Sequence, residues 1–390
     1  MRDFLKRYTL IMETSSPVFI GSGEKISKKE YIFNGKENKV YIPNIGKMYH
    51  FLKDRNLLKS YQGYLLNDNR DFAYWLQSQG IKKSDYMPWI LYSLDSGDAV
   101  FEQRGKKEIL TFQKDAYGQP YIPGSSIKGF FRTALLHNGI QQWEERELRQ
   151  IGFDIKKAER KGRNSYLLRE SKDMEMKYFY TLDKEQKRKN NAVNDCMSGL
   201  RVSDSKPLSI DDLVLCQKID VNIEGSEHKM PLIRECIKPN CTITADITID
   251  ITEFSYTIKE IETAVQSFMN MYQEIFAGKY PGKRMGHSGG NMMLLGGGVG
   301  YVSKTNTYSV LGESGVDTVS RIIDNTLNYK QKRDHKHEKD KSLGVSPHIL
   351  KCTKYNAQLY EMGYCSWKIT VQNHEQLRSK PMKIRLRRRA

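Results

Sequence analysis

Residues 119–138 read QPYIPGSSIKGFFRTALLHN, and this segment sets the fold of the chain. Its Pro123-Gly124 pair indicates a turn, and Ser125 or Ser126 can cap the helix that follows. Beyond the cap, apolar residues recur at i, i+3, i+4, i+7 and i+8, the spacing of one buried helix face: Ile127, Phe130, Phe131, Ala134 and Leu135. The segment therefore predicts an amphipathic helix that packs on a core.

The start of this helix also predicts an anion site. Unpaired N–H groups and a partial positive charge gather at a helix N-terminus, and Gly124 lets a ligand approach the backbone closely. The Ser125 and Ser126 hydroxyls add donors, while Lys128 and Arg132, four residues apart, share a face that points away from the core. We interpret the element as a phosphate cradle. The segment alone leaves open an ordinary capped helix whose basic residues are merely solvated.

The composition favours a polyanionic partner. The 390 residues suggest two or three domains, and the 63 Lys and Arg residues exceed the 46 Asp and Glu residues, which gives a net charge of +17. Such an excess is typical of proteins that bind nucleic acid, with an anionic membrane surface as the second alternative. The 23 tyrosines offer rings for stacking on unpaired bases.

We expect no targeting or membrane segment. The first residues, MRDFLKRY, carry charges where a signal peptide needs its apolar core. No run approaches the roughly 20 apolar residues of a membrane-spanning helix. The sequence therefore predicts a cytoplasmic protein without a membrane partner.

The cysteines and histidines do not suggest a metal site. The six cysteines form no Cys-x-x-Cys, and the closest two, Cys236 and Cys241, have four residues between them. The eight histidines are scattered, and His335 and His337 lie within a charged run. We expect reduced, mostly buried thiols, no structural zinc, no metal ligands and no cofactor.

A glycine-serine loop near the N-terminus is a second candidate site. Residues 8–19 predict a first strand, and Gly21-Ser22-Gly23 follows, with Lys25 soon after. Two glycines around a serine free the backbone to approach a ligand, although such tripeptides also occur in plain loops. The elements expected before the central helix are a strand at 39–43, a helix at 45–58, a helical insertion at 60–102, and a hairpin at 109–112 and 119–122.

The middle of the chain predicts a charged insertion and then a second unit. Lys and Arg residues crowd together within 143–197, which we interpret as an exposed insertion. After it, 200–205 and 213–221 predict strands. The isoleucines of 242–252 alternate as in a half-buried strand, and 258–276 has the apolar stripe of a long helix, so a second α+β unit begins about here.

A glycine-rich loop follows this helix. Residues 286–304 read GHSGGNMMLLGGGVGYVSK and include seven glycines, so few side chains screen the backbone N–H groups from a phosphate. The loop fits neither the P-loop pattern nor the dinucleotide-binding Gly-x-Gly-x-x-Gly, so an ATPase is not expected. The candidate binding residues here are the glycines and two flanking cations: Gly296, Gly297, Gly298, Gly300, Arg284 and Lys304.

The C-terminal part ends in a basic tail. Residues 316–327 predict a helix, and the mixed charge run at 330–341 is interpreted as a solvated loop. The last eight residues, KIRLRRRA, would attract RNA electrostatically without sequence choice.

Three motifs together resemble the RAMP superfamily of CRISPR proteins. They are the Gly-Ser-Gly loop after the first strand, YIPGSSIKGFFR at 121–132, and the late GGGVG at 296–300. Within the superfamily, the chain is similar to the type III-A Csm-complex subunits at the 3′ end of the guide RNA. Three features carry this closer resemblance, which spans residues 8–367: YIP at 41–43, RTAL at 132–135, and LLGGGVG at 294–300 with SKT at 303–305.

The resemblance implies an α+β fold of two RRM-like (ferredoxin-like) RAMP units packed together, with helical and charged insertions. We expect an N-terminal unit at 1–255, with insertions at about 60–105 and 143–197, and a C-terminal unit at 256–390 that carries the glycine-rich loop and the basic tail.

The resemblance also implies a structural subunit rather than an enzyme. Such a subunit binds the 3′ portion of a single-stranded guide RNA (crRNA), contacts neighbouring RAMP backbone subunits and the small helical subunit, and supports guide maturation in antiviral defence. The late glycine loop would help to hold RNA. The other residues implied to contact guide phosphates and ribose are Gly21, Ser22, Gly23, Lys25, Gly124, Ser125, Ser126, Lys128 and Arg132.

Two other functions remain open. RAMP ribonucleases that process guides use His as a general acid or base. The candidates are His50, His137 and His287; His287 lies in the glycine loop, whereas His137 follows the apolar stripe, where packing is expected. A lone Asp204 more often caps a turn than binds a metal. The second alternative is an adaptor that recruits a trans-acting host nuclease through the charged insertion at 143–197.

Overall fold

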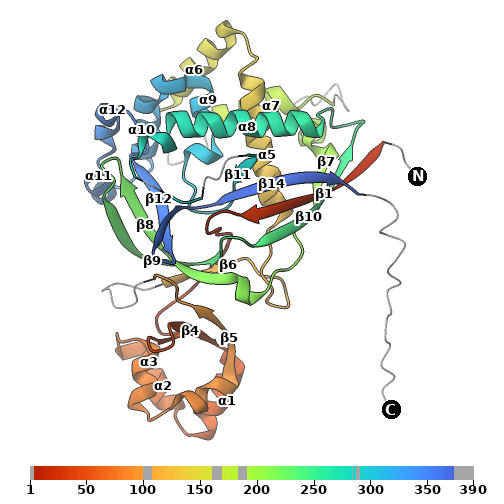
Figure 1. Ribbon diagram of the computed structural model, residues 1–390. Helices are drawn as coiled ribbons and strands as arrows, with labels where there is room; N and C mark the ends of the chain where they lie inside the picture. The colour runs from red at the N-terminus through yellow and green to blue at the C-terminus, as the bar shows by residue number, and fades with distance from the viewer. Residues whose placement is uncertain are drawn as a thin grey trace, which may run out of the picture.

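Two curled sheets form the frame of the chain, with helices packed against them and a small helical subdomain at one end (Figure 1). The computed structural model describes residues 4–99, 108–159, 169–182, 191–282, 284–286 and 290–372. Within these ranges, every helix is too short or too polar to span a bilayer.

The first sheet joins the two ends of the described chain. Its strands are antiparallel and follow the order β11 (Met292–Leu294), β14 (Tyr364–Val371), β1 (Leu5–Thr14), β10 (Thr242–Asp250) and β7 (Leu200–Val202). Leu10 of β1 pairs with Ala245 on one side and Ile369 on the other. The alternating isoleucines predicted a half-buried strand at 242–252, and β10 confirms this prediction.

Two long helices, α5 (Gly124–Ile140) and α8 (Ile258–Ile275), cover one face of this sheet (Figure 1). Phe131 of α5 is fully buried, and its ring meets Trp367 of β14 edge-on at a centroid distance of 5.4 Å. The two helices contact each other through the rings of Phe130 and Phe268, whose centroids lie 5.9 Å apart. Both helices were predicted from the spacing of their apolar residues, and both predictions are confirmed.

The second sheet is larger and mixed. Its main path is β2 (Gly21–Ile26), β6 (Glu108–Phe112), β9 (Glu227–Ile237), β8 (Leu213–Asn222), β5 (Ile90–Asp95), β4 (Lys39–Pro43) and β3 (Ile32–Asn34). A late hairpin of β12 (Ile349–Tyr355) and β13 (Gln358–Glu361) joins it, because β12 pairs with β8. Buried residues of both sheets belong to one continuous core.

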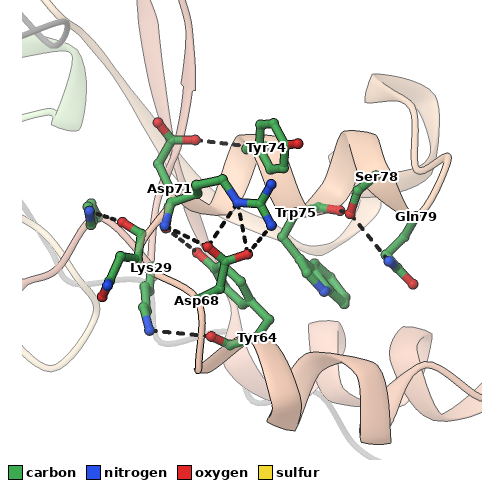
Figure 2. A network of polar contacts seen from close by, with 11 residues as sticks. Lys29, Tyr64, Asp68, Asp71, Tyr74, Trp75, Ser78 and Gln79 are labelled. Atoms are coloured by element: carbon green, nitrogen blue, oxygen red, sulfur yellow. Dashed lines mark hydrogen bonds and ion pairs between the residues drawn. The ribbon is translucent and has the colours of Figure 1, made fainter. Parts of the chain in front are cut away.

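A helical subdomain with a separate aromatic core lies beyond β4 and β5 (Figure 1). Its helices are α1 (Ile45–Asp54), α2 (Leu58–Asn67), α3 (Phe72–Ser78) and α4 (Lys83–Tyr86). Figure 2 shows polar contacts that hold it together. Asp71 accepts the Tyr74 N–H at 3.1 Å and so caps α3, and Lys29 donates to the Tyr64 carbonyl at 3.3 Å.

The remaining helices are α6 (Glu145–Glu159), α7 (Arg169–Phe179), α9 (Thr307–Leu311), α10 (Gly315–Asn325), α11 (Tyr329–His335) and α12 (Asp340–Leu343). Of these, α6 and α9 lie across α8 from the first sheet, and α10, α11 and α12 lie beyond one end of α8, near β8 (Figure 1). The described parts of the predicted insertion at 143–197 are thus largely helical. Ile155 of α6 and Phe179 of α7 are buried and anchor this region to the core.

Several local predictions are wrong. The run at 330–341 is not a loop, because α11, α12 and the short 3₁₀ turn His337–Lys339 occupy most of it. Most residues of this run are exposed and charged, but His337 and Asp340 are buried. The helix expected at 45–58 ends four residues early, at Asp54, because Asn56 has a φ of +56°, and α2 begins only at Leu58.

The elements before α5 also differ from expectation. The helical region that begins after α1 ends at Trp89, and β5 follows, so the stretch 60–102 is not helical throughout. The hairpin expected at 119–122 is reduced to one bridge between Lys114 and Pro120. Proline lacks the N–H that a continuing ladder needs, and a second proline follows at 123.

The proposed boundary between residues 255 and 256 stays a prediction. Each sheet contains strands from before and after this boundary. In the first sheet, β1 pairs with β10 on one side and with the late strand β14 on the other. In the second sheet, β8 pairs with the late strand β12.

Candidate nucleic-acid interface

A surface hollow of about 430 Å³ brings together three of the segments singled out in the sequence. The loop after β1, the first turns of α5 and the glycine-rich loop each contribute part of its wall. The residues that line it are Ile20, Gly21, Ser125, Ser126, Gly129, Phe130, Thr133, Leu294, Gly296, Gly297, Ser303 and Lys304. The lining includes no carboxylate, one cation and several small or hydroxyl-bearing residues, which suits an anionic ligand.

The glycine-rich loop docks on the loop after β1 through its own backbone. The Gly297 N–H donates to the Phe19 carbonyl at 2.7 Å. At Gly296, where φ is +85°, an added Cβ would lie only 2.1 Å from the same oxygen. These two glycines are therefore needed for contact between protein segments, and their contact with RNA stays a prediction.

The other two glycines of the loop differ from each other. An added Cβ at Gly298 would lie 3.0 Å from the Arg234 guanidinium, whereas the space around Gly300 is open. Both have a positive φ, +89° and +83°. The loop therefore combines a tightly packed half with a half that a ligand can approach.

The N-terminus of α5 already has a carboxylate partner. Asp204, which follows β7, accepts the Gly124 N–H at 2.8 Å. An added Cβ at Gly124 would lie 2.2 Å from the Val202 carbonyl, so this glycine permits the close approach of α5 to β7. The exposed Ser125 and half-buried Ser126 remain beside the hollow. Of the residues expected to bind a phosphate at the start of this helix, only the two serines line the hollow.

Lys128 and Arg132 do not belong to the lining of the hollow. Arg132 forms ion pairs with Glu175 at 2.7 Å and Asp195 at 2.8 Å, and its guanidinium lies 4.5 Å from the ring centre of Phe179. Burial lowers the pKa of the nearby Lys128, an effect that Asp195 opposes. The structure brings these two cations together, but on another side of α5, and their RNA contacts stay predictions.

Lys304 is the cation at the hollow itself. Its side chain remains exposed, and in the described ranges it has neither an ion pair nor a hydrogen bond. Removal of water by the surrounding protein lowers its pKa from the ordinary lysine value. A phosphate would oppose this effect by stabilising the charged form.

The remaining predicted cations are engaged with protein groups. Lys25 pairs with Glu108 at 3.0 Å, and the Arg284 guanidinium donates to the Tyr280 and Ala277 carbonyls, both at 2.9 Å. The Ser22 hydroxyl shares a hydrogen bond of 2.5 Å with Thr111 on β6. Gly23 has a φ of +90° and open space around it.

Of the histidine candidates, His137 is a buried packing residue. Its Nδ1 lies 2.8 Å from the Ser309 hydroxyl and its Nε2 lies 3.2 Å from that of Ser267. Burial lowers the pKa of His137 to about 4, so the ring is neutral near pH 7. His50 is exposed on α1, away from the hollow's lining, and His287 lies outside the described residues, as does the basic tail.

Comparison with known proteins gives the class of protein that this fold and site define. Residues 11–300 match the model of the RAMP superfamily, and the chain belongs to that superfamily. It is similar to the CRISPR system Cms protein Csm5 of Mycobacterium tuberculosis, with 28% identity over 394 residues that cover 95% of this chain and 99% of the relative. Csm5 of Streptococcus thermophilus is 29% identical over 325 residues, 78% of this chain and 81% of the relative.

Solved structures show the same fold. A chain of a type III-A Csm–crRNA–target RNA ternary complex gives a TM-score of 0.62 at 19% identity and covers 93% of this chain and 100% of its own length. The crystal structure of T. onnurineus Csm5 gives 0.60 at 18% identity, with 91% and 99% covered. The predicted α+β fold with two RRM-like RAMP units is thereby confirmed.

Proposed function

We propose that this protein is a guide-RNA-binding subunit of a type III-A Csm effector complex. It binds the 3′ portion of the crRNA, caps that end of the assembly, and supports guide maturation without cleaving RNA itself. Its partners are the neighbouring RAMP subunits and the small helical subunit of the complex.

The hollow between α5 and the glycine-rich loop is the observation that carries this proposal. Its described lining combines small, apolar and hydroxyl-bearing residues with one unpaired cation, Lys304, and with Gly129, around which the space is open. Such a surface attracts a ribose-phosphate chain without reading its bases. Guide RNAs vary in sequence along most of their length, so binding of this kind suits them.

The relatives support the choice of complex and partners. Csm5 proteins match 78% to 95% of this chain, and one structural neighbour is a chain of a Csm–crRNA–target RNA complex. The proposed non-catalytic role is supported by His137, a histidine candidate that is buried in packing and lies outside the described lining of the hollow.

A salt titration of RNA binding tests the role of Lys304. Affinity for single-stranded RNA is expected to fall with salt at a log–log slope near −0.7 per neutralised phosphate. Lys304→Ala should make this slope shallower by about 0.7 and weaken different RNA sequences alike, whereas Lys304→Arg should preserve it. The readout is the dissociation constant from fluorescence anisotropy at four or more salt concentrations.

The matched control is Lys59→Ala, which removes an exposed lysine from α2 of the helical subdomain. It should leave the slope at the wild-type value. If both alanine variants change the slope equally, or neither changes it, the hollow is not the site where phosphates bind.

Recruitment of a trans-acting nuclease through α6 and α7 remains an additional proposal. Deletion of 143–197 is a poor test, because Ile155, Met174 and Phe179 are buried in the core and their loss would disturb folding. Charge reversal at the exposed Arg146 and Arg149 of α6 is a better one, read out as loss of the nuclease from pull-downs of the assembled complex.

A further inference from the structure

A buried cluster of two histidines and one aspartate lies outside the described lining of the hollow. It is formed by His337 and Asp340, around the start of α12, and by His348, directly before β12. His337 and Asp340 are buried and His348 is nearly so. The cluster was not recognised in the sequence, because His337 lies within a charged run and His348 comes eight positions after Asp340.

The three side chains converge on a single point. One ligand atom from each residue lies within 4.8 Å of the others. His337 Nδ1 is 3.0 Å from one oxygen of Asp340, and His348 Nδ1 contacts the other oxygen. Donors at roughly 2.0–2.2 Å from a zinc ion lie at most about 4 Å apart, so small side-chain shifts would suffice to place all three around one ion.

The surrounding protein holds these donors in place. The Ser346 hydroxyl donates to Asp340 at 2.6 Å, and the Ser320 hydroxyl donates to the His337 carbonyl at 2.6 Å. On the His348 side, the Tyr308 hydroxyl donates to the Ser346 carbonyl at 2.7 Å. Such supporting hydrogen bonds orient the ligands of protein metal sites.

The charge of Asp340 gives the physical reason to expect a cation. Its side chain is completely buried, and no lysine or arginine forms an ion pair with it in the described ranges. One of its oxygens contacts His337 and also accepts the Ser346 hydroxyl hydrogen bond, while the other oxygen contacts His348. A buried charge is costly unless an opposite charge accompanies it.

We propose that His337, Asp340 and His348 bind one divalent transition-metal ion, with zinc as the best fit to two imidazole nitrogens and one carboxylate oxygen. Each neutral imidazole binds through Nδ1 with its proton on Nε2, and a water completes the tetrahedron. The ion joins the α11–α12 region to β12 and has a structural role, separate from the proposed RNA site.

Zinc titration of the untagged full-length chain, stripped of metal by a chelator and dialysed, tests this site. Calorimetry should detect one equivalent of zinc, and thermal unfolding should shift upwards as free zinc exceeds its dissociation constant. His348→Gln and His337→Gln should weaken binding more than about 100-fold, beyond the loss typical of a supporting residue, whereas Ser346→Ala should weaken it about 10- to 100-fold. His50→Gln, which removes an exposed histidine from α1, should leave binding unchanged.

Cobalt substitution provides a readout on the wild-type chain that does not depend on the folding of variants. A site of two histidines and an aspartate should give the visible bands of tetrahedral cobalt without a thiolate-to-cobalt charge-transfer band. The inference is overturned by a lack of zinc binding, by binding that persists in His348→Gln, or by a charge-transfer band that assigns the metal to cysteines.

Discussion

The buried side chain of His137 on α5 makes the stability of the fold depend on pH. The ring is buried between α5, α8 and α9, with hydroxyl partners on both nitrogens, and burial lowers its pKa to about 4. In the unfolded chain the same group titrates near 6.5. Below that pH the unfolded state takes up a proton that the folded state does not, so stability is lost as pH falls from about 6.5 to about 4.

The expected size of this effect is about 3 kcal/mol in the free energy of unfolding. His137→Gln removes the titrating group, so its stability should fall less than that of the wild type between pH 7 and pH 4. Urea unfolding at several pH values measures the difference, and His50→Gln serves as the exposed control. Parallel pH profiles for wild type and His137→Gln would show that His137 is not the coupled group.

At this scale the sequence reveals residue types but not their partners. The anion-binding character of the α5 N-terminus was predictable, yet its carboxylate, Asp204, lies 80 residues away in the sequence. Arg132 was expected to face a ligand, but it pairs with Glu175 and Asp195, which lie 43 and 63 residues further along the sequence. Tertiary contacts of this kind leave no periodic signal in the chain.

Among the elements, α5 contains two glycines with opposite roles. An added Cβ at Gly124 would lie 2.2 Å from the Val202 carbonyl, while Gly129 has nothing within 4 Å of its position. Backbone atoms cannot give way as a flexible side chain can, so of these two glycines Gly124 is the one that packing requires. Gly129 costs helix stability without a packing benefit.

The paired alanine variants should therefore change stability in opposite directions. Gly124→Ala is expected to lower the free energy of unfolding by about 3 kcal/mol, since it forces α5 away from β7. Gly129→Ala should raise it by about 0.5–1 kcal/mol. Urea unfolding of the two variants measures both, and a similar loss in each would contradict the close approach seen at Gly124.

The strength of the local signal determined which elements could be predicted. The apolar stripes of α5 and α8 and the alternation of β10 extend over many residues, and all three predictions are confirmed. The short helices of 330–341 bury only two residues, which is too few to show a period. β9 begins with the exposed residues Glu227, His228 and Lys229 and contains Pro231, so it lacks the pattern of a strand.

For the whole molecule, the family and fold were predicted from short sequence motifs rather than from hydrophobic periodicity. The superfamily and the pair of RRM-like units followed from three short glycine-containing strings, and the family match over 11–300 confirms the superfamily. Two of the three strings have a structural reason, because the close contacts of Gly124 and Gly296 tolerate no larger residue. The sequence could not show that the loop after β1, α5 and the glycine-rich loop would enclose one hollow.

Photo-crosslinking in the assembled ribonucleoprotein tests the central claim most directly. Guide RNA with 4-thiouridine in its 3′ portion is crosslinked within the Csm complex, and the modified peptides of this subunit are identified by mass spectrometry. We expect crosslinks in peptides that contain Ser125 and Ser126 or span residues 294–304, which form the wall of the hollow. Crosslinks confined to the helical subdomain or to α6 and α7, with none at the hollow, would contradict the proposed RNA site.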